Sequence, residues 1–202
     1  GELAFLGAPE LVRLLSDASR AMCEGEIGQI ERRFHFDLSE EEYLSFLDKK
    51  TASLMAASCR AGGAAAGLSR KQQEALETFG RRLGVAFQIV DDILDLEGDE
   101  AVTGKTLRTD LQHGKMTLPL IRYRDRLGSR SERKKFCESL RDGAGGFSGL
   151  IGKIRDAGAI AESRAKARLF VDEALRALDE LPGHPARQIL SDVAHRLTLR
   201  RF

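Results

Sequence analysis

The sequence predicts an all-α protein, on three observations. Apolar residues recur at three- and four-residue steps along most of the chain, which is the spacing of one face of an α-helix. No segment alternates apolar and polar residues with β-branched enrichment, so we expect no strand. The 202 residues are 42% hydrophobic and 31% charged, a composition that supports a packed core and excludes a disordered chain. We therefore expect a single helical domain over residues 1–202.

The first half of the chain predicts three helix starts. Pro9 stands at the first, and apolar residues at helical spacing follow it. Ser39, with Glu42 three residues later, forms a capping-box signature. The apolar face expected behind this cap comprises Tyr43, Phe46, Leu47, Lys50, Leu54 and Ala57. Ser69 opens the third helix, whose apolar stripe comprises Leu76, Phe79, Leu83, Phe87, Val90 and Leu94.

The second half predicts two further helices and one loop-rich region. Residues 161–181 alternate apolar and charged faces, as the helices of a bundle do. Pro182 and Pro185 interrupt this pattern, and a final helix is expected from residue 186 towards residue 202. Segment 142–152 is rich in glycine and predicts a flexible connection between helices. It is not predicted to cradle phosphate, because no strand precedes it and the G-x-G-x-x-G spacing is missing.

Charge and cysteine usage exclude several classes of protein. A formal net charge of +1 provides no basic surplus for nucleic acid or an anionic membrane as the main partner. Uncharged stretches fall short of the roughly 18 residues of a spanning helix, and no signal peptide is visible. The cysteines form no C-x-x-C pair and predict reduced thiols in a cytoplasmic protein: Cys23, Cys59 and Cys137. Four scattered histidines are interpreted as surface or loop residues: His35, His113, His184 and His195.

One string of aspartates is a candidate metal-binding site. Asp91, Asp92 and Asp95 fall within a single helical turn, flanked on both sides by apolar residues. On a helix Asp91 and Asp95 lie within about 40° of each other. Three neighbouring carboxylates repel one another and need either water or cations, and oxygen-only ligands favour Mg²⁺. A solvated acidic face or a helix end remains the simpler alternative for this string alone.

Lysines accompany the acidic string at three places. Lys50 lies inside an apolar helical stripe, while Lys105 and Lys115 each follow a glycine. Each has an ordinary interpretation, because a lysine in such a stripe usually extends to solvent and Gly104 or Gly114 could end a helix. Lysines also supply point charges that bind phosphate. Together with the carboxylates they fit a diphosphate bridged to metal ions.

These elements, in this order, resemble the C-terminal portion of the trans-isoprenyl diphosphate synthases. Any one element is weak, but their shared order and spacing are specific. The matching strings are Gly25-Glu26-x-x-Gln29, Tyr43-Leu44, Lys50-Thr51-Ala52-Ser53-Leu54, Gly84-x-Ala86-Phe87-Gln88-x-x-Asp91-Asp92-x-x-Asp95, Gly104-Lys105-x-x-x-x-Asp110 and Gly114-Lys115-x-Thr117-Leu118-Pro119-Leu120. The resemblance implies an antiparallel helical bundle of the isoprenoid synthase type. Residues 1–202 would be about its C-terminal two thirds, without the N-terminal helices.

The resemblance also implies an activity, in which isopentenyl diphosphate condenses with an allylic diphosphate to give a polyprenyl diphosphate. Mg²⁺ would assist ionisation, with Asp91 as its principal ligand and Asp92 and Asp95 in support. The catalytic residues Thr51 and Gln88 would face the carbocation. Lysines would hold the allylic diphosphate: Lys50, itself also catalytic, with Lys105 and Lys115. The implied assembly is a homodimer, and the motifs lean towards medium- or long-chain products.

One part of the family pattern is missing from this sequence. The family carries a first aspartate-rich motif on an earlier helix and a basic site for isopentenyl diphosphate, whereas the only DDxxD string here begins at Asp91. Metal ions clamped between two acidic helices cannot be clamped by one, so this chain alone is expected to be inactive. A fragment of a longer synthase is the favoured explanation. A non-catalytic or regulatory subunit of a hetero-oligomeric synthase, a head-to-head prenyl synthase and a helical metal-binding bundle are the alternatives.

Overall fold

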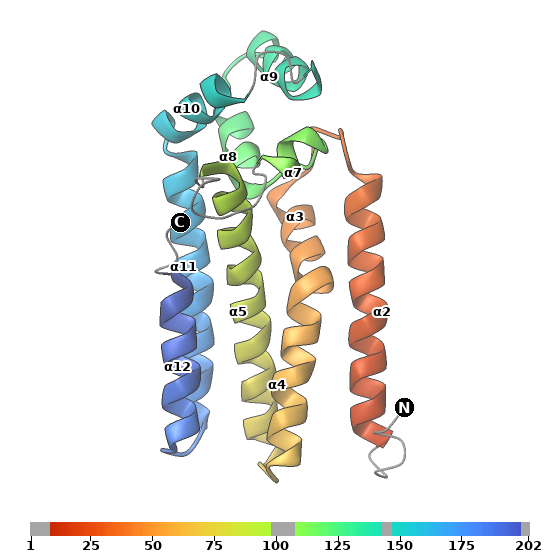
Figure 1. Cartoon of the computed structure of the whole chain (residues 1–202), viewed down its shortest axis with the longest axis vertical. Coiled ribbons are helices and arrows are strands. Elements are labelled where there is room, and N and C mark those ends of the chain that lie inside the picture. The colour runs from red at the N-terminus through yellow and green to blue at the C-terminus, as the bar shows by residue number, and fades with distance from the viewer. Residues whose placement is uncertain (1–8, 98–107, 143–146, 199–202) are drawn as a thin grey trace.

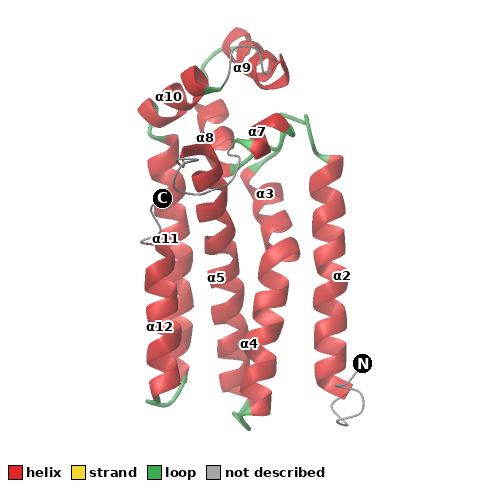
Figure 2. Cartoon of the chain, viewed as in Figure 1, coloured by secondary structure: helices red, strands yellow, loops and turns green. Residues whose placement is uncertain are grey.

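A computed structural model describes residues 9–97, 108–142 and 147–198 of the chain. Long helices run side by side and alternate in direction along the sequence (Figure 1). Every regular element in the described ranges is helical, and none is a strand (Figure 2). The predicted all-α class is therefore confirmed.

The long helices of the first half end at a cluster of short ones. In order, the elements up to this point are α2 (Pro9–Glu31), α3 (Glu40–Leu47), the π-helix η1 (Asp48–Ala52), α4 (Ser53–Ala65) and α5 (Arg70–Glu97). Those that follow are α7 (Thr109–Gln112), α8 (Leu118–Arg126), α9 (Arg130–Asp142), α10 (Ser148–Asp156), α11 (Ala159–Ala177), the 3₁₀-helix η2 (Leu178–Glu180) and α12 (Pro185–Thr198).

Helix α5 is the centre of the bundle. It makes its most extensive contacts with α4 on one side and α11 on the other. Apolar side chains recur along it at helical spacing and are almost fully buried, among them Phe79, Ile89 and Ile93. Burying such side chains provides the main driving force for folding, about 1.5–3 kcal/mol for each. The position of α5 therefore fixes where the residues it carries lie relative to its neighbours.

Two glycines of α5 allow close backbone contact, Gly80 with α4 and Gly84 with the end of η1 that leads into α4. A Cβ atom at Gly80 would lie 2.5 Å from the carbonyl oxygen of Met55. One at Gly84 would lie 2.6 Å from the Cα atom of Ala52. Any side chain at these positions would push the helices apart, so the glycines set the spacing of the whole α4–α5 pair.

Two predicted helix starts are confirmed with their caps. The Ser39 hydroxyl accepts a hydrogen bond from the Glu42 amide, and the Glu42 carboxylate accepts one from the Ser39 amide, at 3.1 and 3.0 Å. At the start of α5, the Ser69 hydroxyl likewise accepts from the Gln72 amide, and the Ser69 amide donates to the Gln72 side chain. These reciprocal bonds satisfy backbone donors that a helix N-terminus leaves unpaired.

The apolar face predicted behind Ser39 is correct up to the π-helix and wrong at one of its two residues beyond it. Tyr43 and Leu47 are fully buried, and Ala57 is buried as predicted, but Leu54 is 38% exposed and Ala56 is buried as well. The cause is η1, which inserts one extra residue into a helical turn. An extra residue rotates everything after it by about 100° relative to a continuous α-helix. Leu54 is thereby turned away from the core.

The glycine-rich segment 142–152 is shorter as a connection than predicted. Helix α10 begins at Ser148, so Gly149 and Gly152 are helical. Ile151 and Ile154 on this helix are buried, and α10 packs on α8 and α11. Burial of these isoleucines outweighs the poor helix propensity of glycine, which costs about 1 kcal/mol per residue.

The remaining expectations concern the chain's later helices, its cysteines and histidines, and membrane-spanning segments. The predicted helix over 161–181 spans α11 and η2, and the final helix starts one residue earlier than predicted. The cysteines are free and all four histidines are exposed, as predicted. Within the described part of the chain, no helix is long and apolar enough to cross a membrane.

Candidate active site

A buried carboxylate organises the polar residues where α5 approaches its C-terminal end. Asp92 is only 2% exposed and accepts hydrogen bonds from three side chains. The Tyr43 hydroxyl donates to Oδ2 at 2.7 Å. The Gln88 amide nitrogen and the Lys115 ammonium donate to Oδ1 at 3.1 and 2.9 Å. Because burial of a carboxylate is costly unless it is paired and hydrogen-bonded, these donors are what makes Asp92 tolerable there.

Thr51 extends this network onto the π-helix. Its hydroxyl donates to the amide oxygen of Gln88 at 3.0 Å. Gln88 therefore accepts from Thr51 with its oxygen and donates to Asp92 with its nitrogen. The backbone contact at Gly84 is one turn away on the same helix, and it brings η1 close enough for this bond. The structure thus joins two of the three predicted catalytic residues directly.

Lys115 is positioned by the way α7 ends. Gly114 has a left-handed φ of +65°, and its amide donates to the Leu111 carbonyl. The Lys115 amide donates to the Asp110 carbonyl, which completes a Schellman motif. The glycine is therefore a helix terminator, as its simpler interpretation held. The same turn also directs the Lys115 ammonium between Asp92 and Asp110, with the Asp110 contact at 2.8 Å.

Burial and charge act together on this cluster. Burial and the neighbouring charge of Asp92 raise the pKa of the Asp110 carboxyl from 3.8 to about 6, against the opposing effect of Lys115. Burial lowers the pKa of Lys115, but Asp92 and Asp110 outweigh it, so this pKa lies above its ordinary value. Burial and Asp92 also raise the pKa of Tyr43 well above 10. Lys115 and Tyr43 are therefore both hydrogen-bond donors at neutral pH.

The three predicted metal ligands lie in three different environments. Asp92 is occupied by the donors just described. Asp95 accepts from the Thr109 hydroxyl at 3.0 Å and from the amides of Thr109 and Asp110, so it caps the N-terminus of α7. Asp91 is exposed, and no residue in the described ranges hydrogen bonds to its carboxylate. Within those ranges, no three acidic, histidine or cysteine side chains gather as a metal site.

Lys50 points away from the Asp92 network. Its ammonium contacts Glu26 at 2.6 Å and the Gln29 amide oxygen at 3.0 Å, both on α2. Helix α2 approaches η1 closely because Gly25 has no side chain, and a Cβ atom there would lie 2.6 Å from the Lys50 amide nitrogen. Lys50 and Thr51 are thus adjacent in the chain but bind different helices. The remaining predicted lysine, Lys105, lies outside the described residues.

Comparison with known proteins identifies the family. A family model described as polyprenyl synthetase matches residues 2–144. The chain belongs to this family. Heptaprenyl diphosphate synthase component 2 of Geobacillus stearothermophilus is 36% identical over 195 residues, which cover 95% of this chain and 59% of that protein. Octaprenyl diphosphate synthase of Escherichia coli is 31% identical over 195 residues, covering 96% and 60%.

Solved polyprenyl synthases share the fold. The crystal structure of the enzyme from Caulobacter crescentus CB15, complexed with calcium and isoprenyl diphosphate, matches with a TM-score of 0.91 at 32% identity. The match covers 99% of this chain and 62% of that one. The chain therefore spans about three fifths of the length of these polyprenyl synthetase relatives. The predicted isoprenoid synthase fold is confirmed.

The sequence motifs do not reveal the partners of the predicted site residues. Those partners all lie within the matched strings, but the strings assign no role to them: Tyr43, Glu26, Gln29 and Asp110. Tyr43 looks like a core residue in the sequence, because it occupies an apolar helical face. Its partner Asp92 is 49 residues away, so only the packing of α3 against α5 brings them together.

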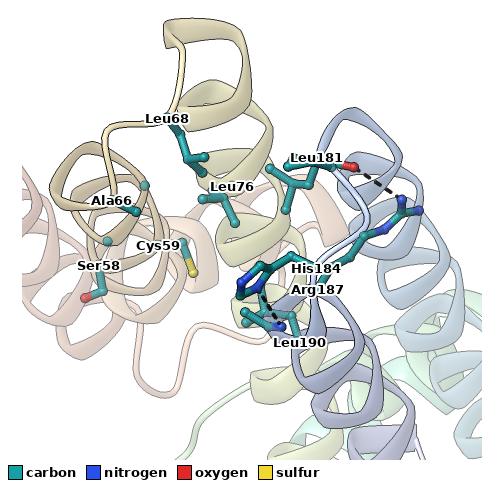
Figure 3. Close-up of a pocket in the computed structure, with 13 residues that line it drawn as sticks. Ser58, Cys59, Ala66, Leu68, Leu76, Leu181, His184, Arg187 and Leu190 are labelled. Carbon is teal, nitrogen blue, oxygen red and sulfur yellow. Dashed lines mark hydrogen bonds between the residues drawn. The ribbon is translucent and has the colours of Figure 1, made fainter.

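The same helix pair carries an apolar pocket at its other end (Figure 3). The pocket has a volume of about 490 Å³ and lies between the end of α4, the start of α5 and the start of α12. Its lining includes Cys59, Leu68, Leu76, Leu181 and Leu190. At its edge, Arg187 donates to the Leu181 carbonyl and to the Asp179 carboxylate, so its charge is already paired.

Proposed function

We propose that this chain forms part of a polyprenyl diphosphate synthase that condenses isopentenyl diphosphate with an allylic diphosphate. The observation that carries the proposal is the network from Thr51 through Gln88 and Asp92 to Lys115. It links the Thr51 hydroxyl on the π-helix to the Lys115 ammonium, and the exposed Asp91 directly precedes Asp92 in the chain. The names of the relatives, heptaprenyl and octaprenyl diphosphate synthase, support the same reaction and a medium- or long-chain product.

Mg²⁺ fits this donor set through Asp91. Asp92 and Asp95 are committed to protein donors, whereas the Asp91 carboxylate is exposed beside them. One carboxylate with water and substrate phosphate oxygens is a common arrangement for Mg²⁺. Asp91 is therefore the proposed principal ligand. Asp92 would support the site by holding Lys115, and Asp95 by holding the start of α7. When bound, Mg²⁺ would neutralise charge on the departing diphosphate.

The chain's own residues would act on the two charges that ionisation separates. As the allylic C–O bond breaks, its electron pair leaves with the diphosphate, which accepts hydrogen bonds from lysines. Lys115 uses donors on Asp92 and Asp110, which leaves one N–H of its three for this purpose. Lys50 would have to exchange its Glu26 contact for the diphosphate, and Lys105 is proposed as the third lysine.

The positive charge remains on the allylic carbon. Thr51 and Gln88 would present oxygen atoms to this carbon, an arrangement that stabilises developing charge without reorganisation. The double bond of isopentenyl diphosphate then attacks this carbon and forms the new C–C bond, and loss of a proton to the departed diphosphate completes the cycle. Excluding water from the site would protect the cation from hydrolysis.

Two further proposals concern assembly. The 202-residue chain alone is expected to be inactive, because its sequence contains one aspartate-rich motif where the resemblance implies two. We expect a homodimer in the cytoplasm. The words "component 2" in the name of the Geobacillus relative make a hetero-oligomer the second candidate. Light scattering of the full-length protein distinguishes them: the homodimer requires twice the subunit mass together with activity in the absence of any second polypeptide.

Substitution of Asp91 tests the proposed reaction. In the full-length protein, Asp91→Ala should reduce Mg²⁺-dependent incorporation of labelled isopentenyl diphosphate by on the order of 10²–10³-fold, as loss of one charge-stabilising group does. Asp172→Ala is the matched control, because Asp172 is an exposed aspartate on α11, another helix of the bundle. Equal turnover in the two variants would remove Asp91 from the site.

A further inference from the structure

The Tyr43 hydroxyl is a fully buried donor to which the proposed reaction assigns nothing. Its side chain has no exposed surface, its hydroxyl donates a 2.7 Å hydrogen bond to Asp92 Oδ2, and the Leu118 backbone amide is directed at its oxygen. The other two donors to Asp92, Gln88 and Lys115, both bind Oδ1. Tyr43 is thus the sole described donor to the second oxygen, and it fixes the plane of the carboxylate.

The direction of these hydrogen bonds fixes the orientation of the Gln88 amide. A carboxylate can only accept, so Gln88 must turn its NH₂ group towards Asp92. Its amide oxygen then faces Thr51, whose hydroxyl donates to it. With its proton committed to Gln88, the Thr51 oxygen keeps lone pairs for other partners. The orientations of Gln88 and of the Thr51 hydroxyl therefore both depend on Asp92 presenting Oδ1 to Gln88.

Without Tyr43 the carboxylate would be free to turn. Oδ2 would have no donor, and both oxygens could approach the Lys115 ammonium, a charged donor that binds carboxylates more strongly than an amide does. Gln88 would then lose the partner that fixes its orientation. A flipped amide would direct N–H groups, instead of its oxygen, towards Thr51.

We propose that Tyr43 is a positioning residue, which orients the Gln88 amide through Asp92 and thereby keeps oxygen atoms of Gln88 and Thr51 available to a cationic substrate carbon. The last step rests on the proposed function. The orientation of Gln88 does not, so it can be tested separately.

The first test observes the Gln88 side chain by NMR. Tyr43→Phe removes the hydroxyl and keeps the ring, and Tyr123→Phe is the matched control because Tyr123 is the chain's only other tyrosine. In protein labelled with ¹⁵N-glutamine, the NH₂ resonances of Gln88 are assigned by their loss in Gln88→Met. We expect them to shift or broaden in Tyr43→Phe and to stay unchanged in Tyr123→Phe. Unchanged Gln88 resonances in Tyr43→Phe would overturn the proposal.

A second variant covers the case in which Tyr43→Phe does not fold. 3,5-Difluorotyrosine incorporated site-specifically at position 43 makes the hydroxyl at that position a stronger donor. The Gln88 NH₂ resonances should again move, since the bond to Asp92 is altered while the side chain keeps its shape. Absence of any change would contradict an orientation set by Tyr43.

A kinetic test addresses the catalytic consequence. In the full-length protein, Tyr43→Phe should lower kcat about tenfold and leave KM for the allylic diphosphate within about twofold, because the interaction matters after ionisation begins. A change in KM alone, or an unchanged kcat, would overturn the catalytic part. An inactive wild-type protein would count against the proposed function, and the NMR result would then decide the orientation alone.

Discussion

The two ends of the α4–α5 pair share close helix contacts at glycine, but one end carries a polar network and the other an apolar pocket. Beyond Gly84 the side chains of Thr51, Gln88 and Asp92 form a connected hydrogen-bond network between the helices. Towards the other end, beyond Gly80, small residues such as Gly63 line an apolar pocket of about 490 Å³. The apolar pocket and the polar network around Asp92 therefore lie at opposite ends of the helix pair. In this molecule a cluster of buried, paired charges is a better guide to the candidate site than a cavity is.

The largest expected effect tests whether Asp92 anchors the polar end of the helix pair. Asp92→Ala should lower the free energy of unfolding by about 3 kcal/mol, because it leaves the buried Tyr43 hydroxyl without an acceptor and Lys115 with one carboxylate fewer. Asp91→Ala, one residue earlier but exposed, should change it by less than about 0.5 kcal/mol. Urea denaturation measures both. Similar losses for the two aspartates would show that Asp92 is not the anchor described.

The shared contact is tested at Gly84. A methyl group there meets backbone, so Gly84→Ala should cost about 1–3 kcal/mol through strain and displacement of α4. It should also lengthen the Thr51–Gln88 hydrogen bond. Chemical denaturation measures the cost, and a crystal structure of the variant measures the displacement. Wild-type stability would mean that the helices are not held at this spacing.

The pocket end should respond to the corresponding change in the opposite direction. Nothing lies within 4 Å of a Cβ atom placed on Gly62, so Gly62→Ala introduces no clash. Because alanine favours the helix more than glycine does, we expect a gain of about 0.5–1 kcal/mol in a thermal or urea unfolding experiment. A loss of stability would indicate that the pocket is filled more tightly than described.

The smallest expected effect concerns the thiol in the pocket. Burial raises the pKa of the Cys59 thiol, whereas Cys23 is exposed. Because the thiolate is the reactive form, Cys59 should react with a disulfide reagent at least about tenfold more slowly than Cys23 at pH 8. Mass spectrometry of the labelled peptides compares them within one sample. Equal rates would show that solvent reaches the pocket freely.

Local signals predicted much of the helical architecture. Ser39 and Ser69 announce helix starts because capping depends on residues only three positions apart, and both starts are observed. The π-helix was not predicted, because one extra residue in a turn leaves no local signature. The error at Leu54 follows directly from that omission. The glycine-rich segment 142–152 looks like a loop in the sequence, because its helical end depends on the packing of Ile151 and Ile154.

The candidate site was predictable as a set of residues but not as a set of contacts. The motif strings identified Thr51, Gln88 and Lys115, which the structure brings together around Asp92. The strings could not reveal that Asp95 caps α7 or that Asp92 is buried, because each depends on a partner distant in sequence. Which carboxylate remains open to a metal ion is likewise a property of the folded chain.

The π-helix also constrains how the sequence can change over time. Because of its extra residue, the turn that carries Thr51 faces the candidate site while α4 turns its packing face towards α5. Deleting one residue between 48 and 52 would give a more regular helix, yet it would rotate one end by about 100° against its neighbours. Substitutions in this turn can accumulate one at a time, whereas a change of length cannot. The π-helix is therefore retained because both the site-facing turn and the packing face of α4 depend on its extra residue.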